Sequence, residues 1–290
     1  MLGDVFVHIG IQEEIKLRGC EEPKLLVPSK DLLAIYELIQ DFDMDSISYK
    51  SESLRSVLKK ARKFFYRYYE VHKVPYEFYR KTSSHEFSFE SEISPFHLPI
   101  KRVDEDIYYG CLGEVLICGE PVRSVYRRVE LPNEITEVST LSYVHEITHS
   151  QVNRVFGSIK NYNNMEILSI FNELLCASSM NDGGRLSYVN DVVRLHNLRY
   201  GIQFLQDGLD RQEELYGMLL EGNSYVESTL KAYNLFIDYL EGEQRMKDYI
   251  ILLIQKVFDG DICVEQCLEA LDITYENSLN VKRLERYLKR

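Results

Sequence analysis

Two histidines four residues apart flank a glutamate in the stretch Tyr143–Ser150, which reads Y-V-H-E-I-T-H-S and contains an H-E-x-x-H sequence. Residues four apart lie on the same face of an α-helix, so His145 and His149 can present their imidazoles to one metal ion. Glu146 is next to the first histidine and can serve as a base toward an attacking water molecule. Two histidine ligands, a carboxylate base and an open coordination position form the arrangement of zinc hydrolases. The sequence therefore predicts one Zn²⁺ per chain.

A mononuclear catalytic zinc needs a third protein ligand, and two downstream carboxylates are candidates. Glu166 and Glu173 are seven residues apart, which is two helical turns, so both lie on one face of one predicted helix. Polar residues at 157–164 predict a turn that folds this helix back antiparallel to the first. Two buried carboxylates facing two histidines would be costly without an ion. Either glutamate can reach the metal, at 17 or 24 positions after His149.

The stretch Glu166–Leu175, which reads E-I-L-S-I-F-N-E-L-L, resembles the third-ligand helix of the oligoendopeptidase F and thimet oligopeptidase family. These are zinc metallopeptidases of the gluzincin type, and the approach E-V-S-T-L at residues 137–141 is similar to theirs as well. The resemblance covers residues 137–240. It implies that Glu166 is the zinc ligand and that Glu173 either orients a ligand or a water molecule or is the alternative third ligand.

The chain departs from the family pattern in three respects. The connection from His149 to Glu166 is shorter by about two helical turns, which favours Glu173 on spacing alone. Ile147 and Thr148 replace the usual Gly-His pair after the glutamate. The chain is also roughly half the family's usual length, so the helical lobe that restricts substrates must be reduced.

The family also places tyrosines on a later helix to stabilise the tetrahedral oxyanion. The segment 222–233 looks like that helix, and Tyr225 is the candidate donor. Tyrosine is abundant here, with 21 copies, and most tyrosines simply pack at helix surfaces. His196 is the one histidine after His149, and it lies on a different predicted helix.

The elements that must position these residues are predicted to be mainly helical. All seven prolines lie at or before Pro132, so the rest of the chain can form helices interrupted only by Gly and Asn. Before Pro132, helices are predicted at Ser29–Phe42 and Ser51–Lys73, and strands Tyr108–Cys118 and Val122–Leu131 are predicted to form a hairpin. After Pro132, helices are predicted at 136–156, 163–180, 185–207, 210–221, 224–241, 244–258, 261–271 and 276–289.

The fold class is therefore mainly α (α+β), with a small antiparallel β-sheet before the H-E-x-x-H helix. Residues 1–132 are expected to hold the N-terminal helices and the sheet, and residues 133–290 the helical catalytic region, in one compact unit. The strand at 122–131 offers an edge to which a peptide substrate could add as a further strand.

Composition excludes several classes of protein. Lys and Arg number 34 against 46 Asp and Glu, a net charge of −12, which argues against a nucleic-acid partner. The longest uncharged apolar stretch, Tyr249–Ile254, is far shorter than the roughly 20 residues that span a bilayer. The chain start lacks a basic signal-peptide region, so we expect no membrane partner and a cytoplasmic protein. The six cysteines form no C-x-x-C pair and are expected to be reduced thiols.

These patterns predict a zinc metalloendopeptidase that hydrolyses short unfolded peptides. His145, His149 and Glu166 would hold zinc, Glu146 would be the general base and Tyr225 the oxyanion donor. The alternative is a non-catalytic helical interaction or scaffold protein that retains a peptidase-like core. The sequence leaves the natural substrate and the oligomeric state open.

Overall fold

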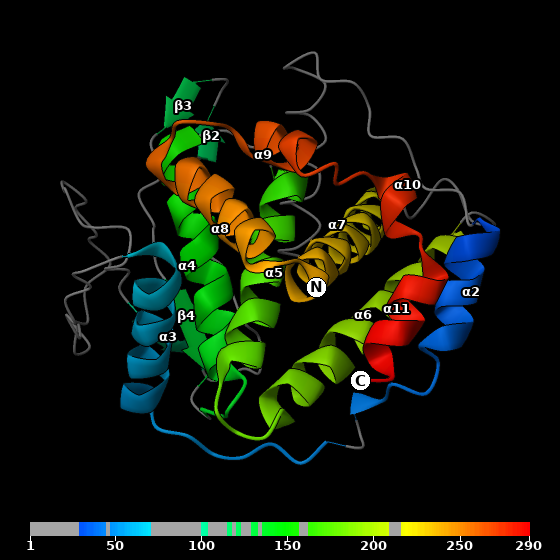
Figure 1. The fold of residues 1–290 in the computed structure, drawn as a ribbon, viewed down its shortest axis with the longest axis horizontal. Coiled ribbons are helices and arrows are strands. Elements are labelled where there is room, and N and C mark those ends of the chain that lie inside the picture. The colour runs from blue at the N-terminus through cyan, green and yellow to red at the C-terminus, as the bar shows by residue number, and fades with distance from the viewer. Residues whose placement is uncertain are drawn as a thin grey trace.

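The structure is a computed structural model that describes residues 29–44, 47–70, 100–103, 115–117, 120–122, 129–132, 135–156, 162–208 and 216–290. Within these residues it is mainly helical, with ten helices (Figure 1), and the predicted mainly α class is confirmed. The helices are α2 (Lys30–Leu38), α3 (Leu54–Tyr69), α4 (Ser139–Phe156), α5 (Tyr162–Ser179), α6 (Arg185–Gly208), α7 (Tyr216–Glu241), α8 (Gln244–Asp259), α9 (Val264–Ala270), α10 (Tyr275–Ser278) and α11 (Val281–Leu288). The strands are β1 (Ile100–Val103), β2 (Val115–Ile117), β3 (Glu120–Val122) and β4 (Val129–Pro132).

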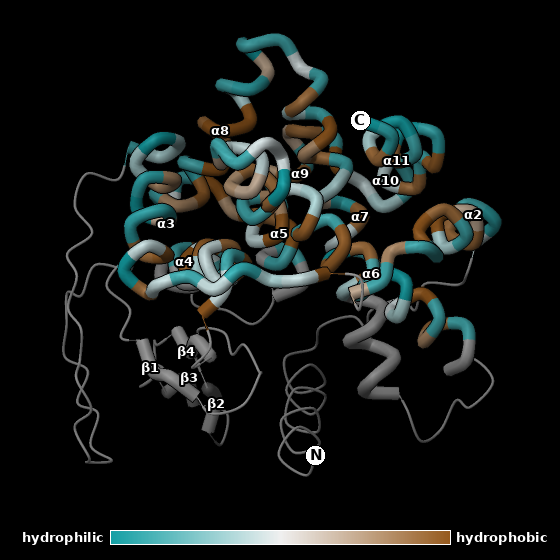
Figure 2. The backbone as a smooth tube through the Cα atoms, turned by 90° about the horizontal axis from the view of Figure 1, so that it is seen from below, coloured by the Kyte–Doolittle hydropathy of each residue, from teal (hydrophilic) through white to brown (hydrophobic). Residues whose placement is uncertain are grey.

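Helix α5 lies at the centre of the helical body. Every residue from 167 to 177 is buried, so α5 has no solvent-facing stripe and must be covered on all sides. Helices α4, α6 and α7 pack directly against it, and α3 covers α4 from the other side (Figure 1). In Figure 2 the hydrophobic positions of α5 and α7 lie where the helices meet.

The outer helices connect distant parts of the chain to this core. Helix α11, near the C-terminus, lies beside α2, and both contact the central pair α6 and α7 through α2–α6 and α11–α7 contacts (Figure 1). One cluster of buried apolar side chains runs from Leu32 in α2 to Tyr287 in α11. The two predicted N-terminal helices therefore pack onto the same core as the predicted catalytic region.

Helix α2 begins where the sequence predicts, α3 begins at Leu54 rather than at the predicted Ser51, and both end earlier than predicted. Ser29 Oγ accepts a hydrogen bond from the backbone N–H of Leu32 (3.1 Å), and Ser53 Oγ accepts one from Ser56 (3.2 Å). Serine at this position satisfies backbone donors that have no partner within the helix. Helix α3 ends at Glu70, whose φ of 50° cannot continue a right-handed helix.

The predicted hairpin between Tyr108–Cys118 and Val122–Leu131 is not formed as predicted. Strand β2 pairs antiparallel with β3 over three residues each, and β4 pairs in parallel with β1 instead. Pro121 lies within β3, opposite Leu116, and has no N–H to donate to that ladder. Most of the predicted strand 108–118 and most of the predicted substrate edge at 122–131 lie outside the described residues.

Two further helix boundaries differ from the prediction. Helix α7 runs without interruption through Gly222, where a break was expected. A helix-interior glycine costs only about 1 kcal/mol relative to alanine, and packing against α5 and α6 offsets such a cost. The predicted helix 276–289 is divided into α10 and α11, because Asn280 begins a new helix by accepting a hydrogen bond from the N–H of Arg283 (3.1 Å).

Three of the cysteines lie in the described part of the chain. Cys176, Cys263 and Cys267 are free thiols there, as predicted, and Cys267 is buried. Among the described helices, none has both the length and the apolar character that crossing a membrane requires.

Candidate metal centre

Hydrogen bonds connect the start of helix α4 to other segments of the same chain. The carboxylate of Glu137 accepts hydrogen bonds from Arg185 Nη2 (2.8 Å) and Nε (3.2 Å) and from the backbone N–H of Lys50 (3.2 Å). Ser139 Oγ accepts one from the N–H of Thr136 (3.0 Å). These contacts attach the start of α4 to Lys50 and to Arg185 at the start of α6.

A chain of buried hydrogen bonds joins α3, α4 and α5 close to the histidines. The hydroxyl of Tyr69 donates to Asn172 Oδ1 (2.5 Å), and Asn172 Nδ2 donates to Thr148 Oγ1 (3.0 Å). The Thr148 hydroxyl in turn donates to the carbonyl oxygen of Val144, one turn earlier (2.9 Å). Asn172 is fully buried, and leaving such polar groups unpaired is costly. The chain therefore sets the register of α4 against α5.

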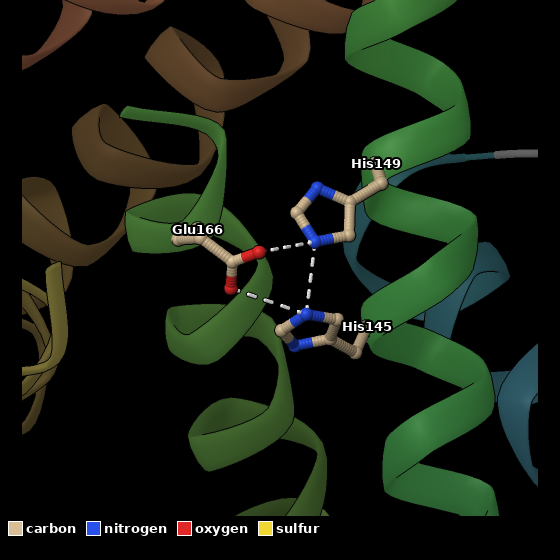
Figure 3. A group of neighbouring side chains, drawn as sticks. All are labelled: His145, His149 and Glu166. Carbon is tan, nitrogen blue, oxygen red and sulfur yellow. Dashed lines mark hydrogen bonds and ion pairs between the residues drawn. The ribbon is translucent and has the colours of Figure 1, made fainter. Parts of the chain in front are cut away.

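His145 and His149 face Glu166 across the α4–α5 interface (Figure 3). The two Nε2 atoms lie 2.9 Å apart. One carboxylate oxygen of Glu166 is 3.0 Å from Nε2 of His149, and the other is 3.3 Å from Nε2 of His145. Within the described residues, these three are the group of His, Cys, Asp and Glu side chains whose ligand atoms converge.

The triangle formed by these atoms has the size that a small tetrahedral ion requires. Zinc bonds to nitrogen and oxygen are about 2.0–2.1 Å, so two ligand atoms on a tetrahedral ion lie about 3.3–3.4 Å apart. The two Nε2 atoms are 2.9 Å apart, and each lies near a different oxygen of Glu166, at 3.0 and 3.3 Å, so neighbouring ligand atoms are within about half an ångström of that value. The donor set of two imidazoles and one carboxylate also suits zinc. The residues present therefore fit a zinc ion.

The charges close to the two histidines also favour a cation. The Glu173 side chain is 1% exposed and that of Glu166 is 16% exposed. Arg194 forms an ion pair with Glu173. With neutral histidines, these two carboxylates and one guanidinium leave an excess of one negative charge among the three groups, in a poorly solvated space. Such an excess is costly unless protons or a cation compensate it.

The same charges shift the pKa values of His145 and Glu166. Burial alone would lower the pKa of His145, but the carboxylates of Glu173 and Glu166 outweigh burial and raise it to about 10. Burial alone would raise the pKa of Glu166, but His149 and His145 hold it well below its usual range. In the metal-free chain, a proton on His145 compensates the carboxylates. A zinc ion would displace this proton, so metal binding is coupled to proton release.

Glu173 lies behind the triangle rather than in it. Its Oε1 is 2.7 Å from Nδ1 of His145, the ring nitrogen that points away from the other ligand atoms. Arg194 from α6 holds the same carboxylate, with Nε 2.6 Å from Oε2 and Nη2 bonded to Oε1. The structure thus brings both candidate glutamates to His145, Glu166 at Nε2 and Glu173 at Nδ1. The assignment of Glu166 as ligand and of Glu173 as its support stays a prediction.

The remaining predicted residues lie around this group. Glu146 is buried on α4, next to His145. Tyr225 on α7 reaches Arg194, whose Nη1 donates to the tyrosine hydroxyl (3.4 Å). His196 is directed to a different part of the chain, since its Nδ1 lies 3.3 Å from the carbonyl oxygen of Phe42 after helix α2.

Arg194 is the site residue that sequence reasoning missed. It is 21 residues from Glu173 and 31 from Tyr225, and nothing in its local sequence marks it. A lone arginine on a predicted helix is usually a solvent-exposed residue. Only the packing of α6 and α7 against α5 reveals its partners.

No protein-family model, curated protein or solved structure matches this chain. The resemblance to the oligoendopeptidase F and thimet oligopeptidase family therefore stays a prediction from the residues quoted above.

Proposed function

We propose that this chain is a zinc-dependent metallopeptidase of the gluzincin type that hydrolyses peptide bonds in short, unfolded peptides. One observation carries the proposal. Two imidazole nitrogens and a carboxylate from two different helices converge at the separations of a tetrahedral zinc site, and the glutamate of the H-E-x-x-H sequence stands beside them.

His145, His149 and Glu166 would hold the ion. When bound, zinc supplies a Lewis acid that makes water acidic enough to lose a proton near neutral pH and that polarises a carbonyl group. The chain's own groups then have separate tasks. Glu146 takes the proton from the attacking water and later gives it to the leaving amine. Tyr225 donates a hydrogen bond to the oxyanion that develops on the scissile carbonyl.

The surroundings of the site support this division of tasks. Glu173 keeps the Nδ1 side of His145 engaged, which leaves the Nε2 lone pair to the metal. Glu146 is buried and directly follows His145 in the chain, so the proposed base lies close to the proposed ligands.

Glu146→Gln tests the proposal. Because glutamine has the shape of glutamate and cannot accept the proton, hydrolysis of a peptide mixture should fall by at least 10²-fold, while zinc stays at one per chain. Zinc per chain by metal analysis and turnover by peptide mass spectrometry measure the two effects. Glu243→Gln, an exposed glutamate at the start of α8, is the matched control and should keep wild-type turnover.

Two outcomes would contradict the proposal. A wild-type chain that folds fully and binds no zinc would favour a scaffold protein with a peptidase-like core. A Glu146→Gln variant that keeps more than about a tenth of wild-type turnover would remove Glu146 as the general base.

A further inference from the structure

Arg194 connects two parts of the site that lie on different helices. Its guanidinium makes two hydrogen bonds to the Glu173 carboxylate on α5 through Nε and Nη2. Its remaining nitrogen, Nη1, donates to the hydroxyl of Tyr225 on α7. The Arg194 side chain is 16% exposed and that of Glu173 only 1%, so this link is largely screened from water.

The contact with Glu173 bears on the geometry of His145. A carboxylate held by a forked pair of N–H groups has a fixed plane and little freedom to rotate. Because Glu173 Oε1 is 2.7 Å from Nδ1 of His145, a fixed carboxylate also restricts where this ring can lie. Arg194 thereby sets the direction of the His145 Nε2 lone pair without touching it.

The contact with Tyr225 influences where the hydroxyl proton of this tyrosine points. A tyrosine hydroxyl has one O–H donor and acceptor lone pairs, and arginine can only donate. When Arg194 occupies a lone pair of Tyr225, the O–H of that tyrosine must point elsewhere. A tyrosine held in this way is ready to donate to a substrate oxygen.

We propose that Arg194 is a positioning residue that couples the His145 ligand to the Tyr225 donor, through the chain His145–Glu173–Arg194–Tyr225. This role rests on the proposed function. It adds Arg194, a residue that lies outside the H-E-x-x-H sequence and the Glu166–Leu175 stretch. It also explains why a charged side chain is retained at a buried position of α6, where an isolated arginine would be unfavourable.

A second arginine on the same helix provides a matched control. Arg185 forms the same kind of two-bonded contact with a carboxylate, Glu137, through Nε and Nη2. That pair joins the starts of α6 and α4, and its hydrogen bonds involve Lys50 and Ser48 rather than Tyr225 or His145. Replacing each arginine with lysine retains the charge and removes the fork, since the lysine ammonium is a compact point charge.

The experiment compares Arg194→Lys with Arg185→Lys in the full chain. Zinc affinity is measured by competition with a chelator, which needs no turnover, and kcat and KM are measured at saturating zinc. We expect Arg194→Lys to lose about tenfold in zinc affinity, the lower end of the range for groups that support metal ligands, and to lose kcat with little change in KM. Arg185→Lys should match the wild type in all three.

A double-variant cycle isolates the coupling to Tyr225. If Arg194 acts on the tyrosine hydroxyl, Arg194→Lys should lower kcat much less in a Tyr225→Phe background than in the wild type. The paired variant Glu173→Gln/Arg194→Met removes both buried charges together, which avoids leaving one unpaired, and should show the same loss of zinc affinity. Circular dichroism verifies that each variant is folded.

The outcomes separate this role from the proposed function. An active, zinc-binding wild type with an Arg194→Lys variant indistinguishable from Arg185→Lys would overturn the role of Arg194 alone. If the effects of Arg194→Lys and Tyr225→Phe on kcat, expressed as free energies, simply add in the double variant, the coupling would likewise be overturned. A wild type that neither binds zinc nor cleaves peptides would remove the proposed function and this role together.

Discussion

Glu166 and Glu173 lie on one face of one helix, yet they contact opposite sides of the same imidazole. Glu166 faces the Nε2 atoms of His145 and His149, while Glu173 faces Nδ1 of His145 and the guanidinium of Arg194. A carboxylate already engaged by a bidentate arginine has little freedom to serve a metal as well. At the scale of single residues, what surrounds a carboxylate therefore decides its task more than its spacing along the helix.

Two isosteric substitutions distinguish these tasks. Glu166→Gln should purify with far less than one zinc per chain, because it replaces a charged ligand with a neutral amide. Glu173→Gln should still bind zinc, with an affinity about 10–100-fold lower, since it only weakens the support of His145. Metal analysis of the two purified variants, followed by chelator competition, measures both. The reverse result would place the ligand at Glu173, two turns further along α5.

At the scale of elements, a second buried carboxylate joins three helices away from the metal site. Asp191 on α6 accepts hydrogen bonds from the hydroxyls of Tyr233 on α7 (2.8 Å) and Tyr287 on α11 (2.9 Å). Burial raises the pKa of Asp191 from 3.8 to about 6, although both hydroxyls act in the opposite direction. The contact that attaches the C-terminal helix is therefore sensitive to pH.

The sign of this sensitivity follows from linkage. The folded state holds the Asp191 proton more tightly than the unfolded state does, so this group stabilises the fold most below about pH 4. That contribution is lost as the pH rises through about 6. At 1.36 kcal/mol per pKa unit it amounts to no more than about 3 kcal/mol.

Asp191→Asn should remove this pH dependence, because asparagine stays neutral and its oxygen can accept both tyrosine hydroxyls. We expect the free energy of unfolding of the variant, relative to wild type, to rise between pH 4 and pH 7. Urea unfolding across that range measures it. Asp248→Asn, at an exposed position on α8, serves as the control. If the free energy of unfolding of Asp191→Asn relative to wild type stays constant between pH 4 and pH 7, the prediction is refuted.

At the scale of the whole molecule, we expect the fold to form without the metal. The buried apolar cluster includes side chains from α2 to α11, whereas the three candidate ligands join only α4 and α5. The Tyr69–Asn172–Thr148 hydrogen bonds join these two helices to each other and to α3 independently of any ion. Zinc should thus add stability to a body that is already folded, unlike a zinc finger, which unfolds without its ion.

Removal of zinc with a chelator should abolish hydrolysis and leave the helical circular dichroism signal unchanged. Returning zinc at about 1,000 times its dissociation constant should stabilise the fold by about 4 kcal/mol, which appears as a higher unfolding temperature. Thermal unfolding with and without zinc measures this effect. A chain that loses its helical signal on chelation would instead hold a structural metal.

Local sequence was sufficient for the features that depend on one helix at a time. The period of an α-helix places His145 and His149 on one face wherever α4 packs, because residues four apart are always neighbours there. The helical class of the chain after Pro132 follows in the same way from the absence of proline. The sequence also predicts the end of α8 at Gly260. The φ of 86° at this position suits a residue without a side chain.

The features that involve two or more helices were decided by the tertiary structure. Whether Glu166 or Glu173 faces Nε2 depends on the rotation and register of α5 against α4, and these are set by buried contacts such as Asn172–Thr148. The role of Arg194 and the continuity of α7 through Gly222 arise from the packing of α6 and α7 against α5. Sequence spacing describes neighbours along one chain segment, whereas burial and charge pairing depend on which segments meet in space.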